Sequence, residues 1–280
     1  MRRGCGLFLL GLAAVAAGAR AQDITLRSTR EVQRLLLAAD PPEISMPVWT
    51  ACKDSPPANY DRNPFIWTGA VIDLTGKAVW NSRTGRFGTT AISPLHVVYA
   101  DHVNGLYPVG TIIRFVAKDD EPVERVVRSS IRIGTTDIDL STLDAPLPGK
   151  IHWYRVMPGN WFFRCSRQAP GTAGRLPCII MDGNTQCIAV KDVANFSQGI
   201  FETMTPVDKR RLAFTRELHP GDSGTPMFIL YGGELILDGI YHTAQGGSEV
   251  SACIPALNAA MRPSGFQVTV ADFSDPRVRQ

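Results

Sequence analysis

The sequence predicts an all-β protein made of antiparallel barrels, preceded by a short N-terminal helix and an extended arm. Past residue 64, short alternating segments follow one another with turn residues between them and no long helical pattern in between. The 280 residues include 20 prolines and 25 glycines, which favours many short strands over long helices. About a dozen strands exceed what one small barrel uses, so we expect two barrels.

The first 21 residues have the pattern of an export signal. Arg2 and Arg3 supply the positive start, residues 7–17 form an apolar run, and residues 19–21 offer small side chains for cleavage. A membrane anchor is the alternative, but the run is shorter than the roughly 20 residues that cross a bilayer. We therefore expect a signal peptide over 1–21 and a secreted or periplasmic mature protein with no membrane partner.

Residues 22–62 are expected to form a helix and a connector arm. The sequence at residues 28–31 has the form of a capping box, which predicts a short amphipathic helix over residues 29–39. The two prolines at 41–42 end this helix, and the chain is then proline-rich and aperiodic up to about residue 62.

The main domain is expected over residues 63–272, followed by a tail at 273–280. A proline-rich seam near residues 148–160 would divide it into a first barrel over about 63–150 and a second over about 151–272. Short apolar or alternating segments predict strands at residues 67–72, 91–92, 97–99, 111–116, 124–128, 178–181, 186–190, 211–214, 225–230 and 234–241.

Six cysteines are present, and removal of the signal segment would take Cys5 and leave five. An odd number leaves at least one thiol unpaired or bound to another chain. Cys178 and Cys187 end a predicted hairpin around an Asp-Gly turn and could be close enough to bridge, so a disulfide bond is expected there. The pairing of Cys52, Cys165 and Cys253 stays open.

Composition also excludes some partners. The net charge is +3 with dispersed charges, too mild to indicate nucleic acid as a partner. No cysteine or histidine cluster has the spacing of a zinc site, so neither a metal nor a cofactor is expected.

The segment Gly221-Asp222-Ser223-Gly224 indicates a catalytic serine. A serine between glycines can sit on a tight turn with an exposed hydroxyl, and the N–H groups of Gly221 and Ser223 could stabilise an oxyanion. Such a serine needs a base and a group that orients the base. His102 and Asp137 lie upstream and supply both residue types.

Three segments resemble the motifs of the chymotrypsin/trypsin-like serine peptidases. Residues 92–103 resemble the strand and small-residue turn that end in the family's catalytic histidine, and residues 137–147 resemble its aspartate motif. The order His102, Asp137, Ser223 is the one found in that family. The resemblance covers residues from about 64 to 272.

The resemblance implies two six-stranded antiparallel barrels with the active site between them, and an exported, monomeric serine endopeptidase acting on polypeptides. Ser223 would attack the scissile carbonyl, His102 would carry the proton, and Asp137 would be buried and hold the imidazole. His96 is the competing histidine but falls in mid-strand, and Asp139 is the competing aspartate, but Asp137 is at the position that matches the family motif.

Substrate preference is indicated by Glu217, which lies six residues before Ser223, at the position that sets side-chain choice in the family. A carboxylate there would favour arginine or lysine in the substrate. Alternatively, His242 and Thr243 would create a site for an acidic side chain.

The chain also departs from the family pattern. No activation sequence supplies a new N-terminus for Asp222, so the protein would fold in its active form or Asp222 would find another partner. The bulky Tyr241 and His242 and the missing cysteines around the nucleophile support an alternative, a catalytically inactive homologue that acts as a binding or regulatory module.

Overall fold

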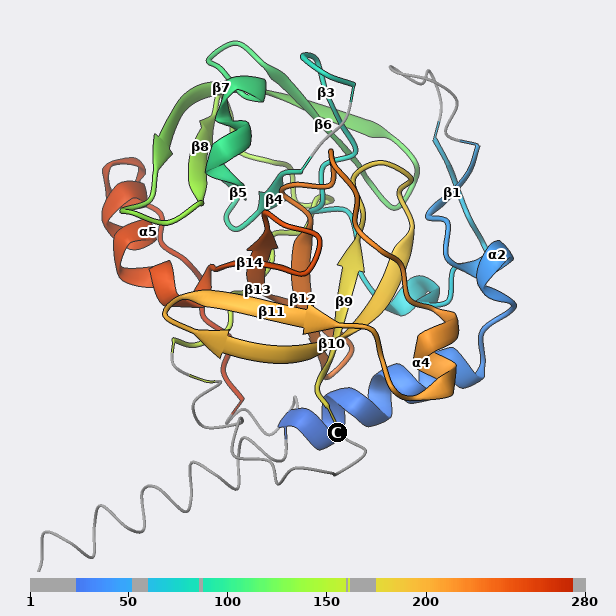
Figure 1. Cartoon of the computed structure of the whole chain (residues 1–280). Coiled ribbons are helices and arrows are strands. Elements are labelled where there is room, and N and C mark those ends of the chain that lie inside the picture. The colour runs from blue at the N-terminus through green and yellow to red at the C-terminus, as the bar shows by residue number, and fades with distance from the viewer. Residues whose placement is uncertain (1–23, 52–59, 86–87, 160, 162–174, 274–280) are drawn as a thin grey trace, which may run out of the picture.

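The computed structural model describes residues 24–51, 60–85, 88–159, 161 and 175–273, and Figure 1 shows two β units stacked one above the other. The expected signal peptide and nearly all of the tail lie outside the described residues, as do Cys52 and Cys165. Within the part of the chain that is described, no helix is long and apolar enough to cross a membrane.

The first unit is a curled six-stranded antiparallel sheet in the order β3-β6-β7-β8-β5-β4. Its apolar interior includes the fully buried Val97, Tyr99, Ile113 and Phe115. Its strands are β3 (Trp80–Asn81), β4 (Thr90–Ala91), β5 (His96–Tyr99), β6 (Ile112–Val116), β7 (Pro122–Arg132) and β8 (Asp139–Leu143).

The second unit is a closed six-stranded antiparallel barrel in the order β10-β11-β14-β13-β12-β9. All residues of β9 and β12 are buried, as expected for strands covered on both sides. The strands are β9 (Pro177–Met181), β10 (Ile188–Ser197), β11 (Ile200–Met204), β12 (Pro226–Tyr231), β13 (Glu234–Tyr241) and β14 (Gly246–Glu249). The expected all-β class with two six-stranded antiparallel units is confirmed, with one unit closed and the other a half-barrel.

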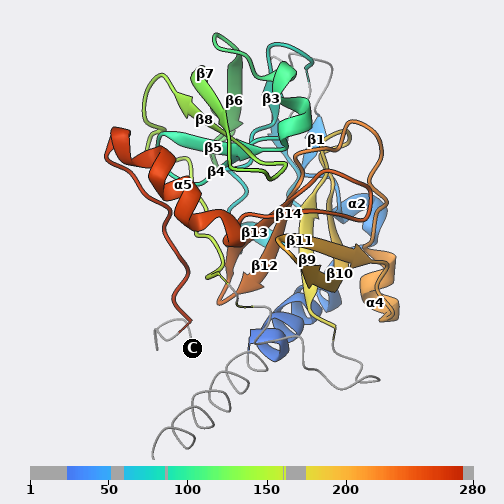
Figure 2. The same ribbon diagram turned by 60° about the vertical axis from the view of Figure 1, so that its left-hand side comes forward.

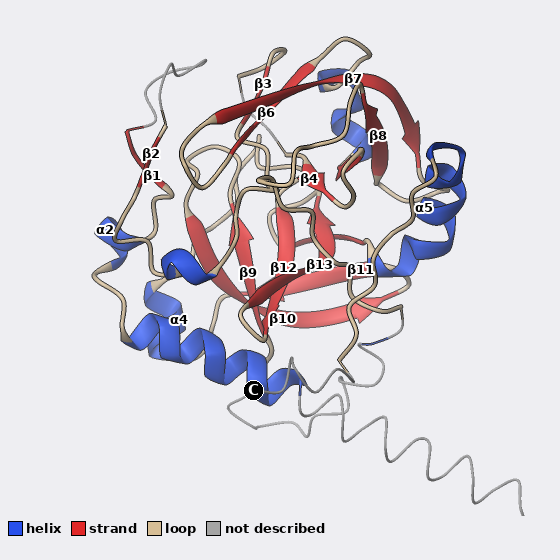
Figure 3. Ribbon diagram, turned by 180° about the vertical axis from the view of Figure 1, so that it is seen from behind, coloured by secondary structure: helices blue, strands red, loops and turns tan. Residues whose placement is uncertain are grey.

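Helices are few and lie outside the sheets (Figures 2 and 3). A helix over residues 24–37 lies beside the closed barrel, and a small hairpin, β1 (Trp49–Ala51) with β2 (Asp61–Arg62), follows it in the arm. The other helices are α2 (Pro42–Ser45), α4 (Lys209–Ala213) and α5 (Ile254–Met261), with 3-10 turns at Gly69–Val71, Asp101–Leu106, Ser251–Cys253 and Arg262–Ser264.

The N-terminal helix is an integral part of the fold. It buries Val32 and Leu36 completely, and the Glu31 carboxylate accepts hydrogen bonds from the N–H groups of Gly232 and Gly233 at 2.8 and 3.0 Å. The helix is longer than predicted, since it already includes residue 24, and the predicted capping box lies inside it. Glu31 therefore binds the β12–β13 turn instead of capping its own helix.

Two predicted strands are wrong. Residues 67–72 form turns and a 3-10 helix, and Trp67 instead anchors the arm on the barrel by donating from Nε1 to the carbonyl of Ile188 at 2.9 Å. Residues 211–214 belong to the region of α4, because the Asp208 side chain accepts hydrogen bonds from the N–H groups of Arg210 and Arg211 and so starts a helix.

The expected disulfide between Cys178 and Cys187 is also wrong, since both thiols are free. The hairpin does form, but its register pairs Cys178 with Lys191 across β9 and β10. Cys187 lies next to the turn, where its Sγ is 3.3 Å from Nη1 of Arg216. The two cysteines are therefore not opposite each other in the hairpin.

Candidate active site

The pairing of β5 with β8 brings two predicted site residues together. Tyr99 at the end of β5 is opposite Asp139 at the start of β8. The chain leaves β5 into the 3-10 turn that carries His102, while Asp137 comes two residues before β8. In an antiparallel pair the end of one strand meets the start of the other, so His102 and Asp137 become neighbours.

Asp137 holds His102 through two contacts. Its Oδ1 accepts the main-chain N–H of His102 at 2.8 Å, and its Oδ2 lies 2.7 Å from Nδ1 of the ring. The Asp137 side chain is 23% exposed, so it is half-buried rather than buried as expected. Burial opposes ionisation, but the hydrogen bonds and charge of His102 outweigh it and hold the pKa of Asp137 below its usual value.

Ser223 lies in the turn between residue 219 and β12. The turn is closed by two hydrogen bonds, from Asp222 N–H to the carbonyl of His219 and from Thr225 N–H to the carbonyl of Asp222. Ser223 Oγ lies 2.8 Å from Nε2 of His102, which belongs to the first unit. A carboxylate only accepts hydrogen bonds, so the proton of the His102 ring is on Nδ1 and Nε2 is free to accept from Ser223.

Close backbone packing fixes the turn that carries Ser223, the candidate nucleophile, against the first unit. A Cβ added to Gly88 would lie 2.4 Å from the carbonyl oxygen of Ser223, and one added to Gly224 would lie 2.4 Å from the carbonyl oxygen of Gly88. Gly224 also has a φ of +89°, which favours glycine. The N–H of Gly88 donates to the hydroxyl of Tyr107 at 2.8 Å.

The N–H groups of Gly221 and Ser223, the predicted oxyanion donors, differ from the other N–H groups of the turn in their hydrogen bonding. The N–H groups of Asp222, Gly224 and Thr225 all donate to main-chain carbonyls. Among the described residues, the N–H groups of Gly221 and Ser223 make no such hydrogen bond. They therefore remain available to an oxyanion beside the Ser223 hydroxyl.

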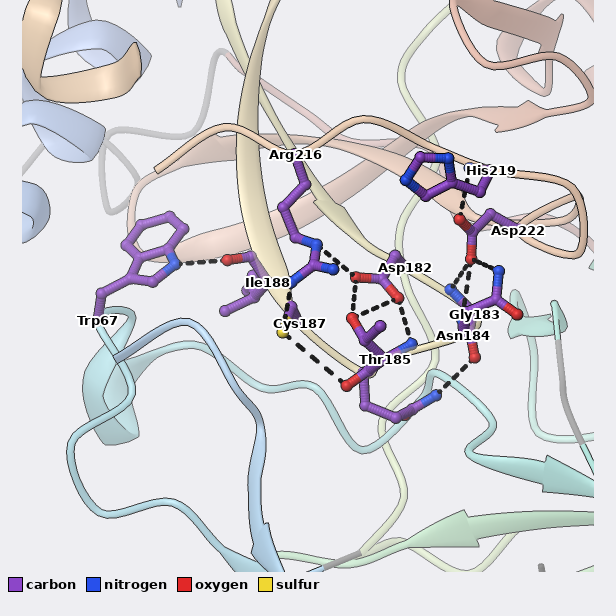
Figure 4. Close-up of polar contacts among 11 residues, drawn as sticks. Trp67, Asp182, Gly183, Asn184, Thr185, Cys187, Ile188, Arg216, His219 and Asp222 are labelled. Carbon is purple, nitrogen blue, oxygen red and sulfur yellow. Dashed lines mark hydrogen bonds and ion pairs between the residues drawn. The ribbon is translucent and has the colours of Figure 1, made fainter. Parts of the chain in front are cut away.

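The Asp222 carboxylate is held by four donors, as Figure 4 shows. Its Oδ1 accepts from the N–H of Gly183 at 3.0 Å and from both the N–H and Nδ2 of Asn184 at 2.8 Å. Its Oδ2 accepts from the N–H of His219 at 2.8 Å. Because these donors come from the turn between β9 and β10 and from His219, the side chain of Asp222 is oriented without an N-terminal ammonium group.

A second buried carboxylate, Asp182, holds the same turn. It accepts from the N–H and hydroxyl of Thr185 and lies 3.4 Å from Nε of Arg216 (Figure 4). Lys77, fully buried in the first unit, interacts electrostatically with both Asp182 and Asp222, while burial lowers its pKa well below the usual value. Sequence patterns did not single out Asp182, Arg216 and Lys77 as supports of the site.

His96 and Asp139, the alternative candidates for the catalytic histidine and aspartate, have other partners. His96 is buried between the hydroxyls of Ser93 and Ser264, at 2.8 and 3.1 Å, and burial lowers its pKa to about 4. Asp139 is buried, and burial together with the nearby Asp101 raises its pKa to about 6. Neither residue belongs to the His102 and Ser223 hydrogen-bond chain.

Of the three residues expected to bind substrate, His242 contacts a residue of this site. Nδ1 of His242 is 2.9 Å from Oδ2 of Asp137 but lacks hydrogen-bond alignment, and its ring is edge-on to His102 with centroids 6.5 Å apart. Thr243 is exposed, and its hydroxyl closes a turn with Gly246. Glu217 is exposed and interacts electrostatically with Lys191.

No group of side chains suited to a metal ion occurs in the described part of the chain. Comparison of the chain with protein-family models and with curated proteins finds no match. The fold and the geometry of the site therefore carry the functional argument by themselves.

Proposed function

We propose that this protein is an exported serine endopeptidase of the chymotrypsin/trypsin-like class that cleaves polypeptides as a monomer. The observation that carries the proposal is the continuous hydrogen-bond chain from Asp137 through His102 to Ser223, with steps of 2.7 and 2.8 Å. This hydrogen-bond chain joins residues of two six-stranded antiparallel units. Two such units are the architecture expected from the resemblance to the chymotrypsin/trypsin-like serine peptidases.

In the proposed reaction, Ser223 Oγ forms a bond to the scissile carbonyl carbon while its proton moves to Nε2 of His102. The electron pair of the carbonyl moves to its oxygen, and the N–H groups of Gly221 and Ser223 stabilise that oxyanion. One such donor typically contributes about 2.7–4 kcal/mol to the transition state.

When the tetrahedral intermediate collapses, the carbon–nitrogen bond breaks and the leaving amine takes the proton from His102. A water molecule then repeats the sequence on the acyl-enzyme and releases the acid product. Asp137 stabilises the imidazolium in both halves and keeps the ring oriented.

The proposal is tested with a fluorophosphonate probe and a general protein substrate. We expect the wild-type protein to be labelled and to cleave the substrate, and both activities to be lost in Ser223→Ala and His102→Ala. Ser197→Ala, which removes an exposed hydroxyl on β10, is the matched control and should behave as wild type. Equal labelling of wild type and Ser223→Ala would disprove the assignment, and absence of all labelling would favour the inactive binding module.

Export is tested separately. We expect the protein recovered outside the cytoplasm to begin at Gln22, after cleavage behind Ala21. An intact N-terminus on the recovered protein would contradict the proposed signal peptide.

A further inference from the structure

Lys191 is a buried lysine inside the closed barrel, with 6% of its surface exposed. It lies on β10 directly opposite Cys178 on β9, and residues paired in this way project to the same face of a sheet. The side chain of Cys178 contacts that of Tyr241 on β13, although β12 separates these two strands. Side chains of non-adjacent strands meet only in the interior, so Lys191 projects into the barrel.

This end of the barrel interior lies next to the nucleophile turn. Tyr241 exchanges main-chain hydrogen bonds of 2.8 Å with Gly224 and Thr225, the two residues after Ser223. Its hydroxyl donates to Thr203 Oγ1 at 2.9 Å, and Thr203 in turn bonds the carbonyl of Gln245. The interior around Lys191 is thus bounded by the nucleophile turn and by the turn that follows His242.

The ammonium group of Lys191 has no hydrogen-bond or ion-pair partner among the described residues. Its electrostatic neighbours are Cys178 and Glu217, and no ion pair joins it to Glu217. Burial raises the pKa of Cys178 to about 12, so the thiol is neutral and provides no counter-charge. An ammonium group on a largely buried side chain and without a partner is costly, and the cost is offset when a carboxylate approaches it.

We propose that Lys191 is the specificity-determining residue of the active site and receives the carboxylate of a glutamate or aspartate side chain on the acyl side of the scissile bond. This inference rests on the proposed peptidase function. It replaces the expectation that Glu217 selects arginine or lysine, because a basic side chain entering here would meet the Lys191 ammonium. Glu217 is exposed and interacts electrostatically with Lys191, so it partly screens the cation.

The test uses reporter peptides that differ only in the residue before the scissile bond, namely Glu, Asp, Gln, Arg or Phe. For the wild type we expect kcat/KM for Glu to exceed that for Gln by about tenfold or more, since a charge-assisted hydrogen bond replaces a neutral one. Cleavage sites in a denatured protein mixture, mapped by mass spectrometry, should likewise follow acidic residues.

Two variants assign the effect to Lys191. In Lys191→Met the ratio of Glu to Gln should fall to about one, whereas Lys191→Arg should keep a preference for acids and shift it toward the shorter aspartate. Lys209→Met removes an exposed lysine from α4 and should leave the ratio unchanged. If Lys191→Met fails to fold, the preference of Lys191→Arg and of the wild type among the reporter peptides still tests the role of Lys191.

The outcomes separate this inference from the proposed function. Fluorophosphonate labelling of the wild type together with preferred cleavage after Arg or Phe would overturn the role of Lys191 and leave the peptidase standing. Absence of both labelling and cleavage would remove the peptidase and this inference with it. A Glu-to-Gln ratio that is unchanged in Lys191→Met would also overturn the inference.

Discussion

His242 and Asp137 are in close contact, with Nδ1 of the histidine 2.9 Å from the same carboxylate oxygen that Nδ1 of His102 approaches at 2.7 Å. Two imidazole rings thus share one oxygen, and only the contact with His102 has the alignment of a hydrogen bond. Burial raises the pKa of Asp137, but the hydrogen bonds and charge of His102 and, to a smaller extent, the charge of His242 lower it below its usual value.

We expect His242→Ala to lower kcat about two- to fivefold, the size of a partly exposed charge contact. Because the contact is made to Asp137, the loss should be equal for reporter peptides with Glu, Gln, Arg or Phe before the scissile bond. A loss confined to one class of side chain would instead show that His242 binds the substrate, the role expected from the sequence.

Asp222 is held by donors of the turn between β9 and β10, and its removal would free them. We expect Asn184→Ala, which deletes one donor to Oδ1, to lower kcat/KM by about tenfold. Asp222→Ala should cost about 100-fold or more, because three buried or half-buried N–H groups would lose their acceptor. Asn195→Ala, on the exposed face of β10, is the control for the amide change, and kcat/KM of the three variants is the measurement.

The same geometry predicts that activity does not require a free N-terminus. A mature chain beginning at residue 22 and a chain with a short tag before it should react with the fluorophosphonate probe at equal rates. A tagged chain that becomes reactive only after the tag is cleaved would contradict the role of the four donors to Asp222.

The helix over residues 24–37 offers a matched pair of stability variants. Leu36 is fully buried and Leu37 is 69% exposed. We expect Leu36→Ala to lower the free energy of unfolding by about 2–5 kcal/mol and Leu37→Ala to change it by less than about 0.5 kcal/mol. Denaturant unfolding measures both, and equal effects would mean that the helix is not packed on the barrel.

Asp238 makes stability depend on pH. It is fully buried, and burial raises its pKa to about 7, above the value of about 3.9 in an unfolded chain. The folded state therefore binds the extra proton between about pH 4 and pH 7, so stability is present at low pH and is lost as the pH rises. The loss for a group shifted this far is about 4 kcal/mol.

Thermal unfolding at pH 5 and pH 8 tests this prediction. We expect the melting temperature of the wild type to be several degrees lower at pH 8, and the difference to shrink in Asp238→Asn, whose amide oxygen still accepts from Trp161 Nε1. Burial, followed by the proximity of Asp238, also raises the pKa of Glu249 to about 7, so part of the pH dependence should remain. Asp61→Asn, at an exposed position of β2, is the control.

The sequence was sufficient to predict the features that depend on local pattern. Strand alternation predicted most of the sheet segments, and motif order brought His102, Asp137 and Ser223 together as candidates. The close approach of His102 and Asp137 depends on the register of β5 with β8, in which Tyr99 is opposite Asp139. Local sequence pattern alone does not specify that register. Short segments such as residues 211–214 were misread because the helix there depends on a cap at Asp208.

The supports of the site were beyond sequence reasoning for a different reason. Lys77, Asp182 and Lys191 lie in segments that look like ordinary strand or turn sequence, and their meaning depends on which residues tertiary packing places beside them. Asp182 was interpreted only as half of an Asp-Gly turn, yet its carboxylate also contacts Arg216.

The backbone contact between Gly88 and the Ser223–Gly224 segment has a consequence for biosynthesis. His102 and Ser223 are separated by 121 positions, and the hydroxyl reaches the imidazole only after both halves have folded and docked. A nascent chain that has emerged from the ribosome only as far as the first half therefore lacks the assembled site. If the proposed peptidase function holds, the cell that makes this protein is spared hydrolysis by unfinished copies of it.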